Sequence, residues 1–221
     1  MTARSHALRL KVDPDLREQL GAVIYDIGAR AIFSPLSGID LLRKRTLDAL
    51  QIRPGNSVLE LGCGSGALTE MLIRRGASVV GVDQSEVMLR RARRRAPQAT
   101  FIHADILDFK CAQKFDQVLI AFVLHHMDAE ARVYTLVLAR AALKPGGLVA
   151  VLDWTKPDTK ALRWLLHGLL AAVEPRSALD WIENGFDTHL KQADLVSIES
   201  RTLAMGVAKV VVARTNPKSA D

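Results

Sequence analysis

The stretch Val58-Leu-Glu-Leu-Gly-Cys-Gly-Ser-Gly66 determines the fold that we expect for this chain. An apolar segment with the character of a strand leads directly into three glycines, and an amphipathic helical pattern begins after them. Glycine permits positive φ angles and a close approach of a ligand to the backbone. The N-terminus of the following helix offers free N–H groups and a positive dipole end, which suit a carboxylate or a phosphate. The stretch predicts a ligand-binding turn, with a tight turn that binds nothing as the alternative.

A second apolar segment, Val79-Val-Gly-Val-Asp83, ends in an acid about twenty residues beyond the loop, where a carboxylate can accept hydrogen bonds from both hydroxyls of a ribose. Two kinds of ligand compete for this pattern. The dinucleotide fingerprint is G-x-G-x-x-G, whereas the glycines here follow G-x-G-x-G. Glu60, just before the loop, adds a negative charge that repels a pyrophosphate and favours a cationic ligand. We therefore prefer a nucleoside with an amino-acid tail over a dinucleotide.

A third segment, Phe101-Ile-His-Ala-Asp-Ile-Leu-Asp108, supplies candidates for binding adenine. Asp105 follows the end of an expected strand and is placed to accept a hydrogen bond from the exocyclic amine. The N–H of Ile106 is placed to donate to a ring nitrogen. Met88, on the helix after Asp83, is placed against the face of the base. A turn cap is the alternative for Asp105, and core packing is the alternative for Met88.

Short apolar segments alternate with amphipathic helices along most of the chain. This alternation predicts an α/β fold whose doubly wound, mostly parallel sheet is covered by helices on both faces. We expect strands at 57–61, 78–82, 100–103, 115–121, 148–153, 194–202 and 208–213. We expect helices from 14 to 50 (in two segments) and at 67–75, 86–96, 128–143 and 157–173.

These three elements, in this order, resemble the class I S-adenosylmethionine-dependent methyltransferases. Two further segments extend the resemblance to Asp153: Phe115–Met127 resembles the fourth-strand motif of that family, and Leu143–Val151 resembles its turn into the fifth strand. The resemblance implies a Rossmann-like sheet of seven strands with the last one antiparallel. It also implies methyltransferase activity with S-adenosylmethionine as the cofactor and no metal.

The resemblance implies a role for each candidate cofactor-binding residue. The loop residues Gly62, Cys63, Gly64 and Gly66 surround the methionine part of the cofactor, with Glu60 near its ammonium group. The remaining roles are ribose binding by Asp83, contacts with the adenine faces by Gln84 and Met88, contacts with the adenine edge by Asp105 and Ile106, and a lining of the sulfonium region by Ala121 or Phe122.

The catalytic candidates are His125 and His126, which follow the fourth expected strand. Methyl transfer is a displacement at a carbon that the sulfonium already activates, so alignment and desolvation supply much of the catalysis. A base is needed only when the acceptor must lose a proton, and a histidine titrates in the right range for that task. The same His-His turn recurs in the resembled subfamily without a fixed catalytic role, which is the alternative.

The substrate side is expected to come from segments outside the common sheet. We divide the single domain, 1–221, into an N-terminal helical cap (1–52), a cofactor-binding core (53–155), a helical lid (156–193) and the final strands (194–214). Tyr25-Asp26, followed by a Ser-Pro-Leu-Ser-Gly turn, resembles the opening of quinone C-methyltransferases and bacterial phospholipid N-methyltransferases. Tyr25 would then close over the methionine part of the cofactor. Apolar residues in the cap, such as Ile32, Phe33 and Leu36, and in the lid, such as Trp164 and Trp181, are expected to line an acceptor pocket. They favour a hydrophobic or amphiphilic small molecule as the acceptor.

Composition and charge limit the other function classes. The 221 residues are 49% hydrophobic and 24% charged, which suits one domain with a sizeable core. Two cysteines without metal-ligand spacing suit a reducing, cytoplasmic location, with contact at a membrane surface as the alternative. The net charge of +6 alone would be compatible with a nucleic-acid partner. We expect none, because the sequence lacks the Asn/Asp-Pro-Pro-Tyr segment typical of enzymes that methylate bases. Arg90–Arg95 is expected to be a solvated helix face.

Three hypotheses for the function remain open at this stage. The first is methylation of a small, apolar molecule, and the second is methylation of a lipid or quinone at a membrane surface. The third is a module that binds S-adenosylmethionine for interaction or regulation without catalysis. A nicotinamide-dependent reductase is disfavoured by the spacing of the glycines and by Glu60.

Overall fold

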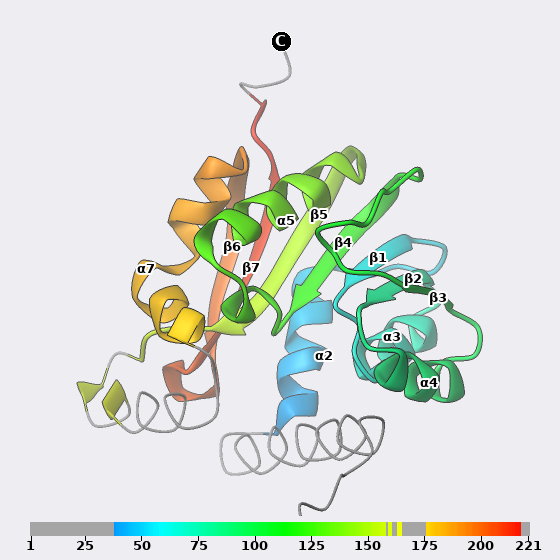
Figure 1. Ribbon diagram of the computed structural model, residues 1–221, viewed down its shortest axis with the longest axis horizontal. Coiled ribbons are helices and arrows are strands. Elements are labelled where there is room, and N and C mark those ends of the chain that lie inside the picture. The colour runs from blue at the N-terminus through cyan, green and yellow to red at the C-terminus, as the bar shows by residue number, and fades with distance from the viewer. Residues whose placement is uncertain (1–37, 158, 161–162, 165–175, 218–221) are drawn as a thin grey trace, which may run out of the picture.

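The computed structural model describes residues 38–157, 159–160, 163–164 and 176–217 of the chain. A seven-stranded sheet with the order β3-β2-β1-β4-β5-β7-β6 runs through the molecule (Figure 1). Its strands are β1 (Ser57–Leu61), β2 (Ser78–Asp83), β3 (Thr100–His103), β4 (Phe115–Ala121), β5 (Leu143–Trp154), β6 (Leu195–Leu203) and β7 (Ala208–Thr215). The α-helices are α2 (Ile39–Ala49), α3 (Ala67–Arg74), α4 (Glu86–Arg95), α5 (Ala129–Ala141) and α7 (Arg176–Gln192), and the short 3₁₀ turns are η2 (Leu124–His126) and η3 (Ala204–Gly206).

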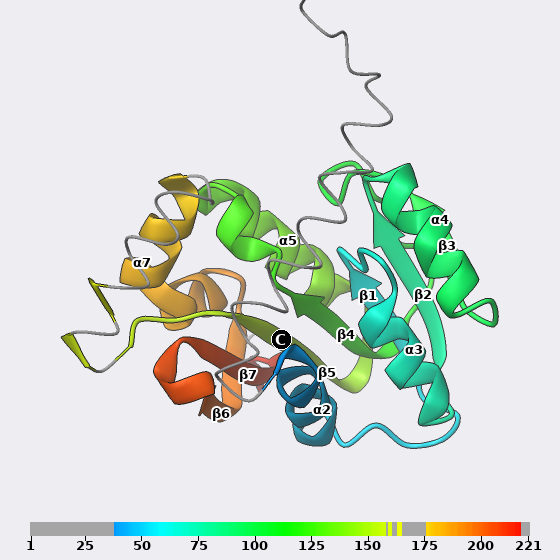
Figure 2. The same ribbon diagram turned by 90° about the horizontal axis from the view of Figure 1, so that it is seen from below.

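The order of the strands determines which face of the sheet each helix covers. Strands β1, β2 and β3 are parallel and advance toward one edge, so right-handed crossovers put α3 and α4 on the same face. The connection from β4 to β5 advances in the opposite direction, which puts α5 on the other face. Figure 2 shows α2, α3 and α4 on one side of the sheet and α5 and α7 on the other. Strand β7 runs antiparallel to both β5 and β6.

Two apolar layers hold the helices to the sheet. On the α2 and α3 side, leucines of both helices pack on side chains of four central strands: Leu47, Leu50, Leu68 and Leu72 on Val58, Leu119, Ala150 and Val212. On the α5 and α7 side, the alternate residues of β4 and β5 contact Leu136, Ala139, Trp181, Ile182 and Phe186. Strands buried on both faces explain why the sequence shows continuous apolar runs rather than alternation.

The doubly wound, mostly parallel sheet that the sequence predicts is confirmed, including its antiparallel last strand. Among the strands the largest difference lies in β5, which begins at Leu143 instead of Leu148 because Leu143 pairs with Phe115. The sequence pattern also missed η2, a single turn directly after β4. The first helix of the expected cap and most of the expected helix at 157–173 lie outside the described residues. Within the described part of the chain, no helix has the length and apolar character needed to cross a membrane.

Candidate active site

The candidate site lies where the parallel strands end. The register pairs Leu61 with Val82 on one side and with Ile120 on the other, and Asp83 pairs with His103. The glycine loop, Asp83 and the end of β4 therefore meet at the same edge of the sheet. This is the point at which the strand order reverses between β1 and β4, the usual ligand site of an open α/β sheet.

The glycine loop has a backbone that only glycine adopts without strain. Gly62, Gly64 and Gly66 all have positive φ angles, between 52° and 75°. A Cβ atom on Gly62 would lie 2.3 Å from Cγ2 of Val123, so the loop packs directly on the residue after β4. A Cβ atom on Gly64 would meet nothing within 4 Å, which leaves open space over the middle of the loop.

Asp83 joins the loop to the start of α4. Its Oδ2 accepts a hydrogen bond from the N–H of Gly64 at 2.7 Å, and its Oδ1 accepts one from the N–H of Ser85 at 2.9 Å. A carboxylate oxygen has two lone pairs, so one acceptor direction on each oxygen remains for another donor. The geometry suits two neighbouring hydroxyl groups.

Glu60 is a buried carboxyl beneath the loop, with 2% of its surface exposed. The hydroxyl of Thr69 donates to its Oε2 at 2.5 Å. Burial raises the pKa of Glu60 to about 8, while the Thr69 hydrogen bond and the charge of Arg43 act in the opposite direction. A nearby cationic ligand would favour the ionised form.

Cys63 fills space between the strands. Cys63 is 5% exposed. Its Sγ packs so closely on Gly81 that a Cβ atom added to Gly81 would lie 2.9 Å from it. Burial, followed by the charges of Glu60 and Asp83, raises the pKa of this thiol above its usual range. Cys63 therefore stays protonated and contributes its backbone, rather than a reactive sulfur, to the loop.

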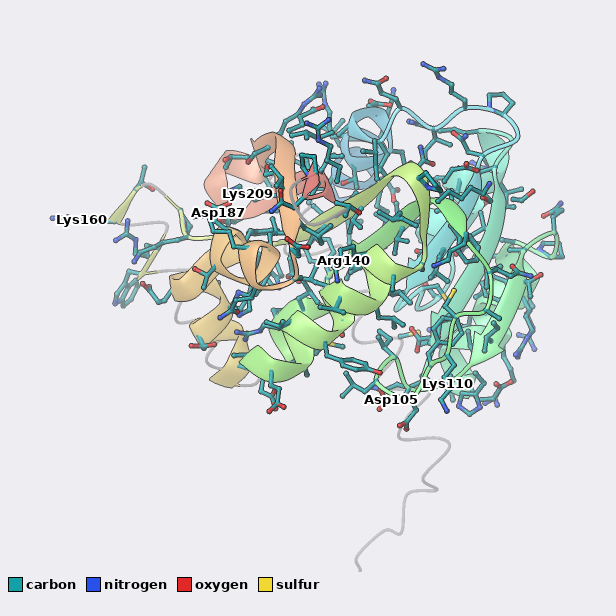
Figure 3. All side chains as sticks on the ribbon, turned by 90° about the horizontal axis from the view of Figure 1, so that it is seen from above. Asp105, Lys110, Arg140, Lys160, Asp187 and Lys209 are labelled. Carbon is teal, nitrogen blue, oxygen red and sulfur yellow. The ribbon has the colours of Figure 1, made fainter. Side chains whose placement is uncertain are left out.

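The expected adenine residues lie around the ends of β2 and β3. Asp105 is exposed in the loop after β3, as Figure 3 shows, and its Oδ1 accepts the N–H of Leu107 at 2.9 Å. This is the turn role left open from the sequence, and it occupies one of the two carboxylate oxygens. Ile106 is buried, Met88 is half-buried and Gln84 is exposed. The ring of His103 binds the carbonyl oxygen of Gln84 at 2.9 Å and so fixes the turn after β2.

The end of β4 forms an apolar corner beside the loop. Ala121, Phe122 and Val123 are half-buried, and Phe122 has a positive φ of 55°, a strained conformation for a residue with a side chain. The N–H of Phe122 donates to the carbonyl of Leu152 at 2.7 Å, which holds the corner against β5. The rings of Phe122 and Trp154 lie 5.4 Å apart.

The two candidate histidines have different environments. His125 is 1% exposed, and its Nδ1 lies 2.7 Å from Oδ1 of the fully buried Asp153. His126 is exposed, with its ring 3.9 Å from that of His125. Desolvation and the neighbouring His125 lower the pKa of His126 to about 4, against an opposing effect of Asp153. His126 is therefore neutral at pH 7, and it is the one of the pair that reaches the surface.

Arg132 links the histidine turn to α7, a connection that the sequence pattern missed. Its guanidinium is completely buried, donates to the carbonyl of Leu124 at 3.1 Å and also binds Asp180 and the carbonyl of Ser177. The guanidinium also lies 5.3 Å from the ring of Trp181. The signal in the sequence was an arginine in the first half of a largely apolar helix, and nothing there identified its partners.

Comparison with known proteins agrees with this geometry. A family model described as a methyltransferase domain matches residues 58–147. An uncharacterized methyltransferase of Synechocystis sp. is 31% identical over 198 residues, which cover 87% of this chain and 92% of the relative. The chain belongs to the methyltransferase family. The class I, S-adenosylmethionine-dependent family predicted from the glycine loop is thereby confirmed.

Two other matches describe the breadth of this methyltransferase family. A demethylmenaquinone methyltransferase of Clavibacter sepedonicus is 30% identical over 189 residues, and the match covers 76% of each chain. The structure of the DhpI–SAH complex superposes with a TM-score of 0.66 at 20% identity and covers 91% of this chain and 94% of that one. At that identity the superposition establishes the fold alone.

The residues of this methyltransferase fit S-adenosylmethionine. Glu60 is a buried carboxyl that suits the ammonium group, and the open space over Gly64 leaves room for the methionine chain. The remaining acceptor directions of Asp83 suit the ribose hydroxyls. When bound, this cofactor supplies a methyl group already activated by a sulfonium.

Several predicted positions do not join the described site. Tyr25 and the apolar cap residues Ile32, Phe33 and Leu36 lie outside the described residues. Trp164, expected to line an acceptor pocket, is 81% exposed, whereas Trp181 is 1% exposed and packs in the core against Phe186. The expectation of a place in the pocket lining was wrong for Trp181, because the buried Arg132 and the carbonyl of Trp154 hold it in the core, and it stays a prediction for Trp164.

Proposed function

We propose that this methyltransferase transfers the methyl group of S-adenosylmethionine to a small hydrophobic or amphiphilic acceptor. The observation that carries the proposal is the apolar corner formed by Ala121, Phe122 and Val123, which packs directly on the cofactor loop through Gly62. An acceptor that rests against this corner lies beside the part of the loop where the methionine chain is expected.

The donor side is held by charge and by shape. Glu60 attracts the ammonium group, the N–H groups at the start of α3 face the carboxylate, and Asp83 accepts hydrogen bonds from the ribose. Gln84 and Met88 flank the adenine, and Asp105 and Ile106 contact its edge. These residues fix the direction of the transferable methyl, which supplies the alignment that a displacement requires.

The acceptor side works mainly by excluding water and by orienting the acceptor. Phe122, which packs on the buried Trp154, provides aromatic surface, and Met127 after the same turn is half-buried. An apolar surrounding strengthens the attraction between a nucleophile and the electrophilic methyl group.

We assign different tasks to the two histidines. His126 reaches the surface and is neutral at pH 7, so it can accept a hydrogen bond from the acceptor, although its low pKa makes it a weak base. His125 is fixed by Asp153 and positions His126 through the contact between the two tilted rings. The best acceptors for this arrangement are nucleophiles that need little help to lose a proton.

The second candidate function is methylation of a quinone or lipid at a membrane surface. The relative named as a demethylmenaquinone methyltransferase supports a quinone acceptor. The third is a binding module without catalysis. Release of S-adenosylhomocysteine from a panel of quinols, phenols, amines and carboxylates separates catalysis from mere binding.

The first experiment is calorimetric titration of the full chain with S-adenosylmethionine, S-adenosylhomocysteine and NADH, repeated with Asp83→Ala and Asp108→Ala. Asp108 is an exposed carboxylate on the same edge of the sheet and serves as the matched control. We expect binding of the first two ligands, a loss of about 100-fold in Asp83→Ala, and wild-type affinity in Asp108→Ala. Binding of NADH instead, or equal losses in both variants, would sink the assignment.

A further inference from the structure

The three helices on one side of the sheet carry a large excess of positive charge. Helices α2, α3 and α4, with Arg75 at the end of α3, hold ten basic and four acidic residues, an excess of six. The formal net charge of the entire chain is also +6. We call the outer surface of these helices the basic face.

The described helices on the opposite side of the sheet are balanced in charge. Helices α5 and α7 contain four basic and four acidic residues, so they add no net charge. One of the four bases, Arg132, is completely buried and adds nothing to the surface. The described helices therefore carry a large positive excess on one side of the sheet and none on the other, and Figure 2 shows which helices lie on which side.

Ion pairs within the basic face do not remove its charge. All four acidic side chains pair with arginines of the same face: Asp40 with Arg43, Asp48 with Arg75, Glu70 with Arg74, and Glu86 with Arg93. The positive excess includes Lys44, Arg45 and Arg94, which are all exposed. The last-turn arginines of α4 are explained by their favourable interaction with the helix dipole. The basic residues of α2 are not, because none of them lies in its last turn.

The side chains of this face suit a diffuse anionic surface. The three helices contain no Asn, Gln, His or aromatic residue. They lack the amides that pair with base edges and the aromatic rings on which bases stack. Long arginine side chains over an apolar base, with Leu41 exposed at the start of α2, match the interface of a lipid bilayer.

We propose that the basic face docks this methyltransferase onto membranes rich in anionic lipid. The docking surface is formed by α2, α3 and α4 and does not depend on which molecule accepts the methyl group. Attraction by the surface potential acts within a Debye length, so docking is reversible and sensitive to salt.

The test is co-sedimentation of the full chain with vesicles of phosphatidylcholine alone and vesicles with about 30 mol% phosphatidylserine. The test variant is Lys44→Gln/Arg45→Gln/Arg94→Gln, and the matched control is Lys160→Gln/Lys191→Gln/Lys209→Gln, which removes the same charge elsewhere. Figure 3 shows Lys160 and Lys209 at the end of the molecule that carries α7. Thermal unfolding and titration with S-adenosylhomocysteine verify that both variants remain folded.

We expect binding to the anionic vesicles only, with a partition coefficient reduced about 100-fold in the test variant and about fivefold or less in the control. Raising the salt from about 0.05 M to about 0.5 M should release the protein. Equal binding to both kinds of vesicle, or equal losses in the two variants, would overturn the proposal. Displacement from vesicles by an equimolar RNA duplex would reassign the face to nucleic acid and overturn it as well.

Discussion

At the scale of single residues, position 62 has no room for a side chain because of the atom that faces it. Gly62→Ala brings a Cβ atom to 2.3 Å from Cγ2 of Val123 at a φ of 74°, and we expect a loss of about 3 kcal/mol in the free energy of unfolding. Val123→Ala removes the atom that the new Cβ meets. The double variant Gly62→Ala/Val123→Ala should therefore lose much less stability than the sum of the losses of the two single variants. Gly146→Ala, at a similar φ with open space around it, is the control and should lose about 1 kcal/mol. Urea denaturation measures all four, and additive losses would contradict the packing argument.

The buried carboxyl of Glu60 makes the ligand-free protein less stable as the pH rises. Its pKa is about 8 in the folded chain against an ordinary value of 4.5, so between these values the unfolded state has released a proton that the folded state retains. Each pH unit in that window lowers the free energy of unfolding by about 1.4 kcal/mol. Glu60→Gln removes this contribution and should flatten the pH profile. Urea denaturation at several pH values measures it, and parallel profiles for the two proteins would refute the expectation.

The same carboxyl couples cofactor binding to proton release. The ammonium group favours ionised Glu60, so binding at pH 7 should release a proton, and affinity should increase with pH until about pH 8. Calorimetry in two buffers of different ionisation enthalpy counts the proton. Glu60→Gln should release none. An unchanged proton count in that variant would show that another group titrates on binding.

At the scale of elements, Arg132 joins three parts of the chain that are distant in sequence. Arg132→Met leaves the carbonyls of Leu124 and Ser177 without their charged donor, and we expect a loss of about 3 kcal/mol in the free energy of unfolding. Arg140→Met on the same helix breaks a partly exposed pair with Asp194 and should lose less than about 1 kcal/mol. Denaturant unfolding compares them, and equal losses would show that the buried position of Arg132 adds nothing.

The comparison of these elements shows what the sequence can predict. The strands, the glycine loop and Asp83 were predictable because each depends on a short apolar run and on the residues adjacent to it. The hydrogen bond between His125 and Asp153 spans 28 residues, and the contact of Arg132 with Asp180 spans 48. Such partners are set by the packing of helices on the sheet, which local periodicity does not encode. For the same reason Trp181 was expected in a pocket and lies in the core.

At the scale of the whole molecule, the sheet depends on its last strand in sequence. Strand β7 lies between β5 and β6 and is bonded to both, so its removal leaves β6 without a partner and β5 with one open edge. A chain without residues 207–221 should show no cooperative thermal transition. A chain without residues 218–221 keeps the bonds of Asn216 to Asp194 and should melt like the wild type. A cooperative transition in the shorter chain would contradict the dependence.

The position of β7 also bears on how the protein is made. A ribosome delivers β5 and β6 before β7, and β6 has no neighbour in the sheet other than β7. During this interval β5 exposes an unpaired, apolar edge, and such edges invite association with other chains. Strands β1 to β5 can assemble as they emerge, but the sheet is complete only when β7 inserts between β5 and β6. The nascent chain is therefore most in need of a chaperone in the interval between the emergence of β5 and that of β7.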